Sequence, residues 1–295
     1  MSRSNDAGDG PGIGSGTTTI DGTRLAYRRA GTDGPPVVLL HGGGIDDADL
    51  SWRHAIDDLA TDHRVYAPDW PGYGDSPDRE EHSTAAYARL LGGFLDRVVP
   101  DEPVALAGIS MGGAAALGYA LENPGRVDRL VLVGSYGLGP RVPGGSLWKT
   151  LAHVPGANAA GWAALGTSRA AARMGLGNVV ADPGGLPPEF VESVVSRARR
   201  PDAGRAFEAF VRAELRSDGT ARTDYTDRLG DLSVPTLLVH GRADPLFPVA
   251  WSERAATEIP DARLETVDCG HWVPRERPDE FVALIRTFLE CSRRQ

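Results

Sequence analysis

A serine placed between two glycines has the spacing expected of an enzymatic nucleophile. Ser110 is the centre of a G-x-S-x-G pattern at residues 108–112. A short apolar run precedes the pattern at 104–107, and an alanine-rich stretch follows from residue 114. Between a strand and a helix, such a serine occupies a sharp turn that exposes its hydroxyl at the end of a sheet. The two glycines remove side chains that would collide with neighbouring backbone.

A serine hydroxyl is a poor nucleophile at neutral pH, so it needs a base, and the base needs an acid that fixes its orientation. His271 follows a predicted strand at 264–267, and Asp244 follows a predicted strand at 236–239. The carboxyl ends of parallel strands lie at one edge of a sheet, where active sites collect. The sequence therefore predicts that Ser110 is the nucleophile, His271 the base and Asp244 the acid, in the chain order of one class of hydrolases.

Three glycines, Gly42, Gly43 and Gly44, follow another predicted strand at 37–40. Without side chains, their N–H groups can approach a ligand closely. We expect an oxyanion hole formed by the N–H of Met111, immediately after the serine, and that of Gly43, with Gly44 as the alternative donor. Further substrate contacts are expected from three residues: Gly42, Gly44 and Trp272.

Other histidines and aspartates near predicted strands are expected to be structural. His41 should brace the glycine loop, and Asp69 should hold the loop at 69–77 by accepting backbone N–H bonds. Asp268 is near His271, but the acid is expected one strand earlier. Structural positions are also expected for His153 and His240, whereas Asp231 precedes a strand and so lies at the wrong end of the sheet.

Strand and helix patterns alternate along most of the chain, which predicts a mostly parallel sheet with helices on both faces. The sequence Asp21-Gly22 predicts the turn of a hairpin between strands at 17–20 and 24–29. Further strands are predicted at 37–40, 64–67, 104–107, 130–133, 236–239 and 264–267. Helices are predicted at 52–60, 84–98, 114–123, 249–258 and 278–291.

Two segments depart from this alternation. Residues 1–16 have no apolar periodicity, which predicts a disordered tail. Residues 137–230 have helical patches but no convincing strand, which predicts a helical cap inserted into a core made of 17–136 and 231–295. Two of the helical patches are Phe190, Val191, Val194, Val195, Ala198 and Phe207, Phe210, Val211, Leu215.

The composition narrows the class of partner. The chain has 295 residues and a formal net charge of −9, which argues against nucleic-acid binding. It has no apolar run long enough to span a membrane, no signal peptide pattern and only two cysteines, Cys269 and Cys291. We therefore expect a cytoplasmic protein that does not bind membranes. The sequence has no phosphate-loop, dinucleotide or metal motif, so we expect a small-molecule substrate and no cofactor or metal. Its oligomeric state is left open.

These motifs resemble those of the α/β-hydrolase family over residues 17–291. The resemblance implies an eight-stranded, mostly parallel sheet with a helical cap inserted after the sixth strand. Within the family, the chain looks most like the carbon–carbon bond hydrolases that cleave aromatic ring-fission products. The likeness is carried by residues 41–44, 110–113 and 269–272, and by Asp279-Glu280-Phe281.

The polar residues of that subgroup are replaced in this sequence. Ile109 and Trp52 align with two asparagines of the subgroup, and Ser193 aligns with its cap arginine, with Arg197 one turn later. The chain thus lacks the polar side chains that would orient a charged substrate in that subgroup. The sequence favours hydrolysis of a carboxylic ester with a small to medium, largely apolar acyl group. Carbon–carbon hydrolysis, lactone or perhydrolase chemistry, and ligand reception without turnover remain the alternatives.

In the predicted cap, four residues either line an apolar pocket or pack helices together: Trp148, Leu151, Trp162 and Leu165.

Overall fold

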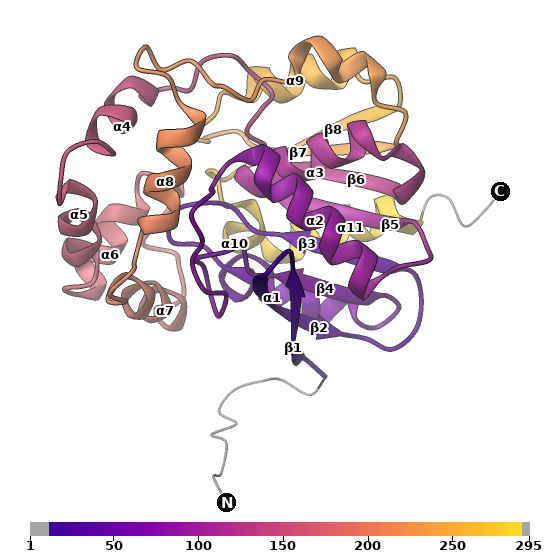
Figure 1. Ribbon diagram of the computed structural model, residues 1–295, viewed down its shortest axis with the longest axis horizontal. Coiled ribbons are helices and arrows are strands. Elements are labelled where there is room, and N and C mark those ends of the chain that lie inside the picture. The colour runs from indigo at the N-terminus through magenta and orange to yellow at the C-terminus, as the bar shows by residue number, and fades with distance from the viewer. Residues whose placement is uncertain (1–11, 291–295) are drawn as a thin grey trace, which may run out of the picture.

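The computed structural model describes residues 12–290, which contain one eight-stranded sheet (Figure 1). The strand order is β1-β2-β4-β3-β5-β6-β7-β8. The strands from β4 to β8 in this order are all parallel, whereas β1 and β2 pair antiparallel to their neighbours. The expected mostly parallel sheet is confirmed. The strands are β1 (Gly14–Ile20), β2 (Thr23–Ala30), β3 (Pro36–Leu40), β4 (Arg64–Pro68), β5 (Val104–Ile109), β6 (Val127–Val133), β7 (Thr236–Gly241) and β8 (Ala262–Val267).

The hairpin starts earlier than the sequence predicts. The expected disordered tail over 1–16 is wrong for residues 14–16, which belong to β1, while residues 1–11 lie outside the described part of the chain. Gly16 pairs with Tyr27, and a Cβ on this glycine would lie 2.5 Å from the tyrosine hydroxyl. The aromatic ring thus covers a glycine whose own strand propensity is low. The turn is the predicted one, with positive φ of 47° at Asp21 and 78° at Gly22.

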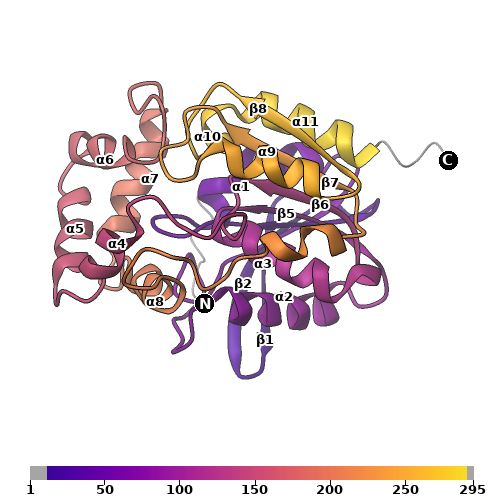
Figure 2. The ribbon, with the colours of Figure 1, turned by 90° about the horizontal axis from the view of Figure 1, so that it is seen from above.

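Helices cover both faces of the sheet (Figure 2). Successive strand residues point to opposite faces, so Val38 and Leu40 pack with one group of helices and Val37 and Leu39 with the other. The first group comprises α2 (Thr84–Val98), α3 (Met111–Glu122) and α9 (Val249–Glu258). The second comprises α1 (Ala48–Leu59), α10 (Val273–Glu276) and α11 (Pro278–Glu290). The catalytic candidates therefore extend from a sheet that is buried on both sides.

The chain between β6 and β7 forms a helical insertion beside the sheet (Figure 1). It contains α4 (Gly145–Leu151), α5 (Ala157–Leu165), α6 (Arg169–Leu176), α7 (Pro188–Ala198) and α8 (Arg205–Glu214). Two isolated bridges, Arg141 with Thr220 and Leu215 with Ala221, close its base. Among the described residues, two short 3₁₀ helices precede the strands on either side of the insertion: η1 (Pro124–Arg126) before β6 and η2 (Thr226–Asp231) before β7. Within residues 12–290, no helix has the length and apolarity needed to cross a membrane.

Candidate active site

Ser110 occupies a strained turn between β5 and α3. Its φ of 53° and ψ of −117° lie in a backbone region that residues other than glycine rarely adopt. Its N–H donates to the Val133 carbonyl at 2.9 Å, which holds the turn against the neighbouring strand. A Cβ on Gly108 would lie 2.5 Å from the Gly112 carbonyl oxygen, and a Cβ on Gly112 would lie 2.5 Å from the His41 carbonyl oxygen. The steric role predicted for both glycines is confirmed.

Asp244 and His271 form a buried hydrogen-bonded pair at the ends of β7 and β8. His271 Nδ1 donates to Asp244 Oδ2 at 2.7 Å. The other oxygen, Oδ1, accepts the N–H groups of Leu246 at 2.7 Å and Phe247 at 3.0 Å. Burial alone opposes ionisation of Asp244, but His271 and the hydrogen bonds to the carboxylate outweigh it and hold the pKa of Asp244 well below its usual range. Asp244 is thus an ionised acceptor that fixes the imidazole.

His240 adds a contact to this pair that the sequence did not reveal. Its Nε2 lies 3.2 Å from both Asp244 Oδ2 and the Phe247 carbonyl oxygen. Both are acceptors, so Nε2 carries a proton and donates, while in the neutral ring Nδ1 accepts from the Ser252 hydroxyl at 2.7 Å. The expectation of a structural position is therefore too narrow, because this fully buried histidine contacts the candidate acid directly.

Gly134, directly after β6, leaves room for the pair. A Cβ at this position would lie 3.1 Å from His271 Nδ1 and 3.2 Å from Asp244 Oδ2, and φ is +44°. Space and backbone conformation both favour glycine here. The local sequence carries no signal for this role, because Asp244 and His271 lie in the loops after β7 and β8, more than 100 residues away.

The loop that carries His271 is tied to the insertion. The His271 N–H donates to the Val179 carbonyl at 2.8 Å. Glu276 Oε2 accepts the N–H groups of Gly270 at 2.9 Å and Ala181 at 2.7 Å. One carboxylate thus bridges the histidine loop and residues 179–181 of the insertion, so the insertion helps to position the candidate base.

The glycine loop is braced as the sequence predicts. His41 Nδ1 donates to the Gly42 carbonyl at 2.8 Å, and Nε2 accepts the Trp70 N–H at 2.9 Å. Burial lowers the pKa of His41, which keeps the ring in the neutral form that this pattern requires. Gly43 and Met111 both line the same cavity as Ser110. Met111 is the first residue of α3, so its N–H has no acceptor within the helix.

The other acids and histidines weighed in the sequence lie away from the cavity. Asp69 accepts the N–H groups of Ala48 at 2.9 Å and of Asp75 at 3.0 Å, which is the loop-holding role expected of it. Asp268 pairs with an arginine at the surface. His153 is exposed on the insertion, and its ring bonds the Lys149 carbonyl at 2.8 Å.

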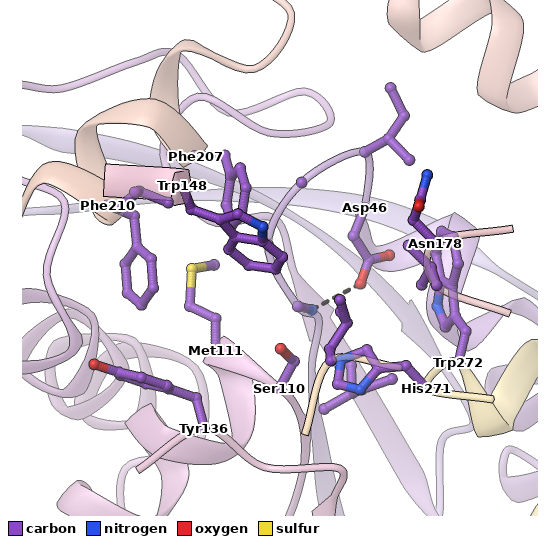
Figure 3. A pocket seen from close by; sticks show the side chains of 18 of the residues that line it. Asp46, Ser110, Met111, Tyr136, Trp148, Asn178, Phe207, Phe210, His271 and Trp272 are labelled. Atoms are coloured by element: carbon purple, nitrogen blue, oxygen red, sulfur yellow. Dashed lines mark hydrogen bonds between the residues drawn. The ribbon is translucent and has the colours of Figure 1, made fainter. Parts of the chain in front are cut away.

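An apolar cavity of about 270 Å³ lies between the sheet edge and the insertion. The side chains of Ser110 and His271 both point into it (Figure 3). The expected substrate contacts Gly42, Gly44 and Trp272 all line it. Its aromatic walls are Tyr136, Trp148, Trp162, Phe207, Phe210, Phe247 and Trp272.

Three of the four insertion residues that the sequence offers as pocket-lining residues do line the cavity. Trp148, Trp162 and Leu165 line the cavity. Leu151 does not, because it lies on the outer side of α4 and is 47% exposed. Among the described residues of the lining, the one acid is Asp46 and none is an arginine or lysine.

Arg197, on the α7 turn that follows the expected cap arginine position, is engaged elsewhere. Its guanidinium forms a two-pronged ion pair with Asp47, with Nη2 donating to Oδ1 at 3.2 Å and Nε to Oδ2. Asp47 also caps α1 by accepting the Leu50 N–H at 2.8 Å. Arg197 is absent from the described lining of the main cavity, so this pair fastens the insertion to the core.

Comparisons with known proteins agree with this architecture. Residues 35–278 match the family model described as alpha/beta hydrolase fold. The chain is 31% identical over 267 residues to a 2-hydroxy-6-oxo-2,4-heptadienoate hydrolase of Pseudomonas putida, covering 88% of this chain and 90% of that protein. A meta-cleavage product hydrolase of Pseudomonas fluorescens superposes with a TM-score of 0.77 at 27% identity, covering 95% of this chain and 98% of that one. A thermophilic esterase of Thermogutta terrifontis superposes with a TM-score of 0.74 at 25% identity, covering 93% and 96%. The chain belongs to the α/β-hydrolase fold family.

Proposed function

We propose that this protein is a serine hydrolase that cleaves carboxylic esters with an apolar acyl group. The observation that carries the proposal is the strained turn of Ser110, which opens into the same apolar cavity as His271, whose ring is held by Asp244. A serine, a histidine base and an oriented acid are the groups that acyl transfer requires. The aromatic walls of the cavity suit an alkyl or aryl acyl group.

The proposed reaction has two steps. His271 removes the Ser110 proton, and Ser110 Oγ attacks the ester carbonyl while the N–H groups of Met111 and Gly43 hold the oxyanion. His271 then gives its proton to the leaving alcohol, which leaves an acyl-enzyme. Water, deprotonated by His271, attacks the acyl carbon, and the acid is released as Ser110 recovers its proton.

A panel of p-nitrophenyl esters from acetate to octanoate tests the proposal. We expect multiple turnovers, with kcat/KM reduced about 10³-fold or more in both Ser110→Ala and His271→Ala. The double variant should be no slower than either single variant, because the two groups act as a unit. His153→Ala, which changes an exposed histidine outside the cavity, is the matched control. Turnover by Ser110→Ala at the wild-type rate would refute the nucleophile assignment.

Carbon–carbon hydrolysis is the second candidate, supported by the likeness to the heptadienoate hydrolase over most of the chain. That substrate carries a carboxylate, whereas the described cavity lining lacks an arginine or lysine to pair with it. We therefore expect 2-hydroxy-6-oxo-2,4-heptadienoate to be a poorer substrate than the best neutral ester, measured by the decay of its colour. A higher kcat/KM on the dienoate would make carbon–carbon hydrolysis the function.

A further inference from the structure

Asp46 is a buried acid in the loop between the glycine triplet and α1. Its Oδ2 accepts the Gly42 N–H at 2.7 Å, and its Oδ1 accepts the Asp47 N–H at 2.8 Å. The Ser51 hydroxyl donates to the same carboxylate and accepts the Trp272 indole N–H at 2.8 Å. In each of these hydrogen bonds Asp46 is the acceptor, which is the arrangement an ionised carboxylate requires.

The carboxylate lies close to the reacting serine. A Cβ on Gly42 would be 3.2 Å from Asp46 Oδ2 and 3.4 Å from Ser110 Cβ, so the two side chains lie on the same side of this glycine. Asp46 also belongs to the cavity wall (Figure 3). The remaining wall is mostly apolar, and a charge beside such a cavity is screened less than a charge in water.

Four titratable or charged groups face Asp46 from the elements packed around it. His41 stays neutral because burial lowers its pKa, and burial also raises the pKa of Tyr73 far above its usual value. Asp47 is ion-paired with the insertion. Arg275, on α10, remains cationic because burial lowers its pKa only to about 10, and its guanidinium stacks over a phenylalanine ring outside the described cavity lining. The one acidic residue of the described cavity wall therefore keeps its negative charge beside a bound substrate.

We propose that Asp46 is an electrostatic specificity determinant, which selects neutral ligands over anionic ligands of the same shape. The proposal deepens the proposed ester hydrolase, on which it rests, by restricting its substrates to those without a carboxylate near the reacting carbonyl. The hydrogen bond to Gly42 explains why an acid is kept there, since the same carboxylate holds the glycine loop in place. Coulomb's law at an intermediate dielectric predicts that a negatively charged ligand binds roughly tenfold more weakly than a neutral one when only one or two side chains separate its charge from Asp46.

The test compares two inhibitors that differ in charge but little in shape, hexane-1-sulfonate and hexane-1-sulfonamide. Their dissociation constants are measured by calorimetry for wild type, Asp46→Asn and Asp46→Ser at pH 8 and pH 5. At pH 8 we expect the ratio of the anion's to the amide's dissociation constant to be roughly tenfold larger in wild type than in either variant. Burial raises the pKa of Asp46 to about 6, so this difference should disappear at pH 5.

Asp49→Asn is the matched control, because it removes one negative charge from α1 at a residue that pairs with Arg28 and lies outside the cavity wall. It should keep the wild-type ratio. Asp46→Ser guards against a folding defect caused by a misplaced amide N–H₂ group. Wild-type ratios in both Asp46 variants at pH 8 would overturn the proposal. Because binding needs no turnover, a protein that shows the ratio change but cleaves no ester would refute the proposed function and leave the specificity role of Asp46 supported.

Discussion

Replacing Gly134 by alanine tests whether the space beside the Asp244–His271 pair matters for catalysis. The new Cβ would approach His271 Nδ1 to 3.1 Å and Asp244 Oδ2 to 3.2 Å, closer than ordinary van der Waals contacts. The pair must then move by a few tenths of an ångström. Because a misplacement of about 1 Å in a catalytic group costs on the order of 100-fold, we expect kcat/KM to fall about tenfold.

The same substitution also strains the backbone, and this second effect must be separated from the first. At a φ of +44°, alanine costs about 1–2 kcal/mol of folding free energy. Gly156, with φ of +78° and no neighbouring atom within 4 Å of the place that a Cβ would occupy, supplies the matched control. Gly156→Ala should lose comparable stability without losing activity. Thermal unfolding should show a decrease of about 2–4 °C per kcal/mol for each variant.

Two assays decide the outcome. Ester hydrolysis gives kcat/KM, and the rate at which a fluorophosphonate labels Ser110 reports activation of the nucleophile independently of the natural substrate. We expect both rates to fall in Gly134→Ala and neither to fall in Gly156→Ala. If Gly134→Ala retains wild-type labelling and turnover while showing the expected loss of stability, the space at Gly134 does not control the pair.

Three further predictions follow from the contacts around the site. The pKa of Asp244 lies below its unfolded value of about 3.9, so the ionised carboxylate stabilises the fold fully above that pH and loses this effect as the pH falls further. Asp244→Asn should therefore weaken the decrease in melting temperature at acid pH. Arg197→Ala should reduce stability by about 1–3 kcal/mol in chemical denaturation and, because it leaves the charge of Asp47 unpaired beside Asp46, should lower kcat/KM for anionic esters relative to neutral esters. Glu276→Ala leaves three backbone N–H groups, those of Gly270, Ala181 and Trp272, without their acceptor and should lower kcat about tenfold. Glu276→Gln should be intermediate because its amide oxygen can still accept, and equal activity of all three proteins would contradict the bridging role.

Local sequence patterns predicted the parts of the fold that depend on neighbouring residues. The Asp-Gly turn and Gly108 follow from backbone conformations or close approaches within a few residues, whereas Gly112 is recognised by the G-x-S-x-G spacing although its close neighbours are the carbonyls of Leu40 and His41. Helical spacing predicted the buried face of α7, because periodic apolar residues of one helix pack in the same direction. The ends of β7 and β8 located Asp244 and His271 for the same reason, since strand ends can be recognised one strand at a time.

Most of the missed roles depend on how the chain turns back on itself or on contacts between distant segments. His240 is only four residues from Asp244, but the two meet because the loop after β7 turns back, whereas Glu276 acts through amides of the histidine loop and of the insertion. Gly16 belongs to a strand because Tyr27 covers it from the paired strand. Leu151 has the spacing of a packed helix residue, but α4 presents that side to solvent. Local spacing alone predicts none of these outcomes.

The insertion contacts the core at three separated points, and this arrangement links the shape of the cavity to the position of His271. Its Val179 carbonyl accepts the N–H of His271, and its Arg197 holds the first turn of α1 beside Asp46. Its Glu214 accepts the N–H of Thr84 at the start of α2. The elements that form the outer cavity wall therefore also fix the loops that carry His271 and Asp46. Substitutions in the insertion that change the acyl preference should consequently alter kcat as well as KM, whereas a detached lid would alter KM alone.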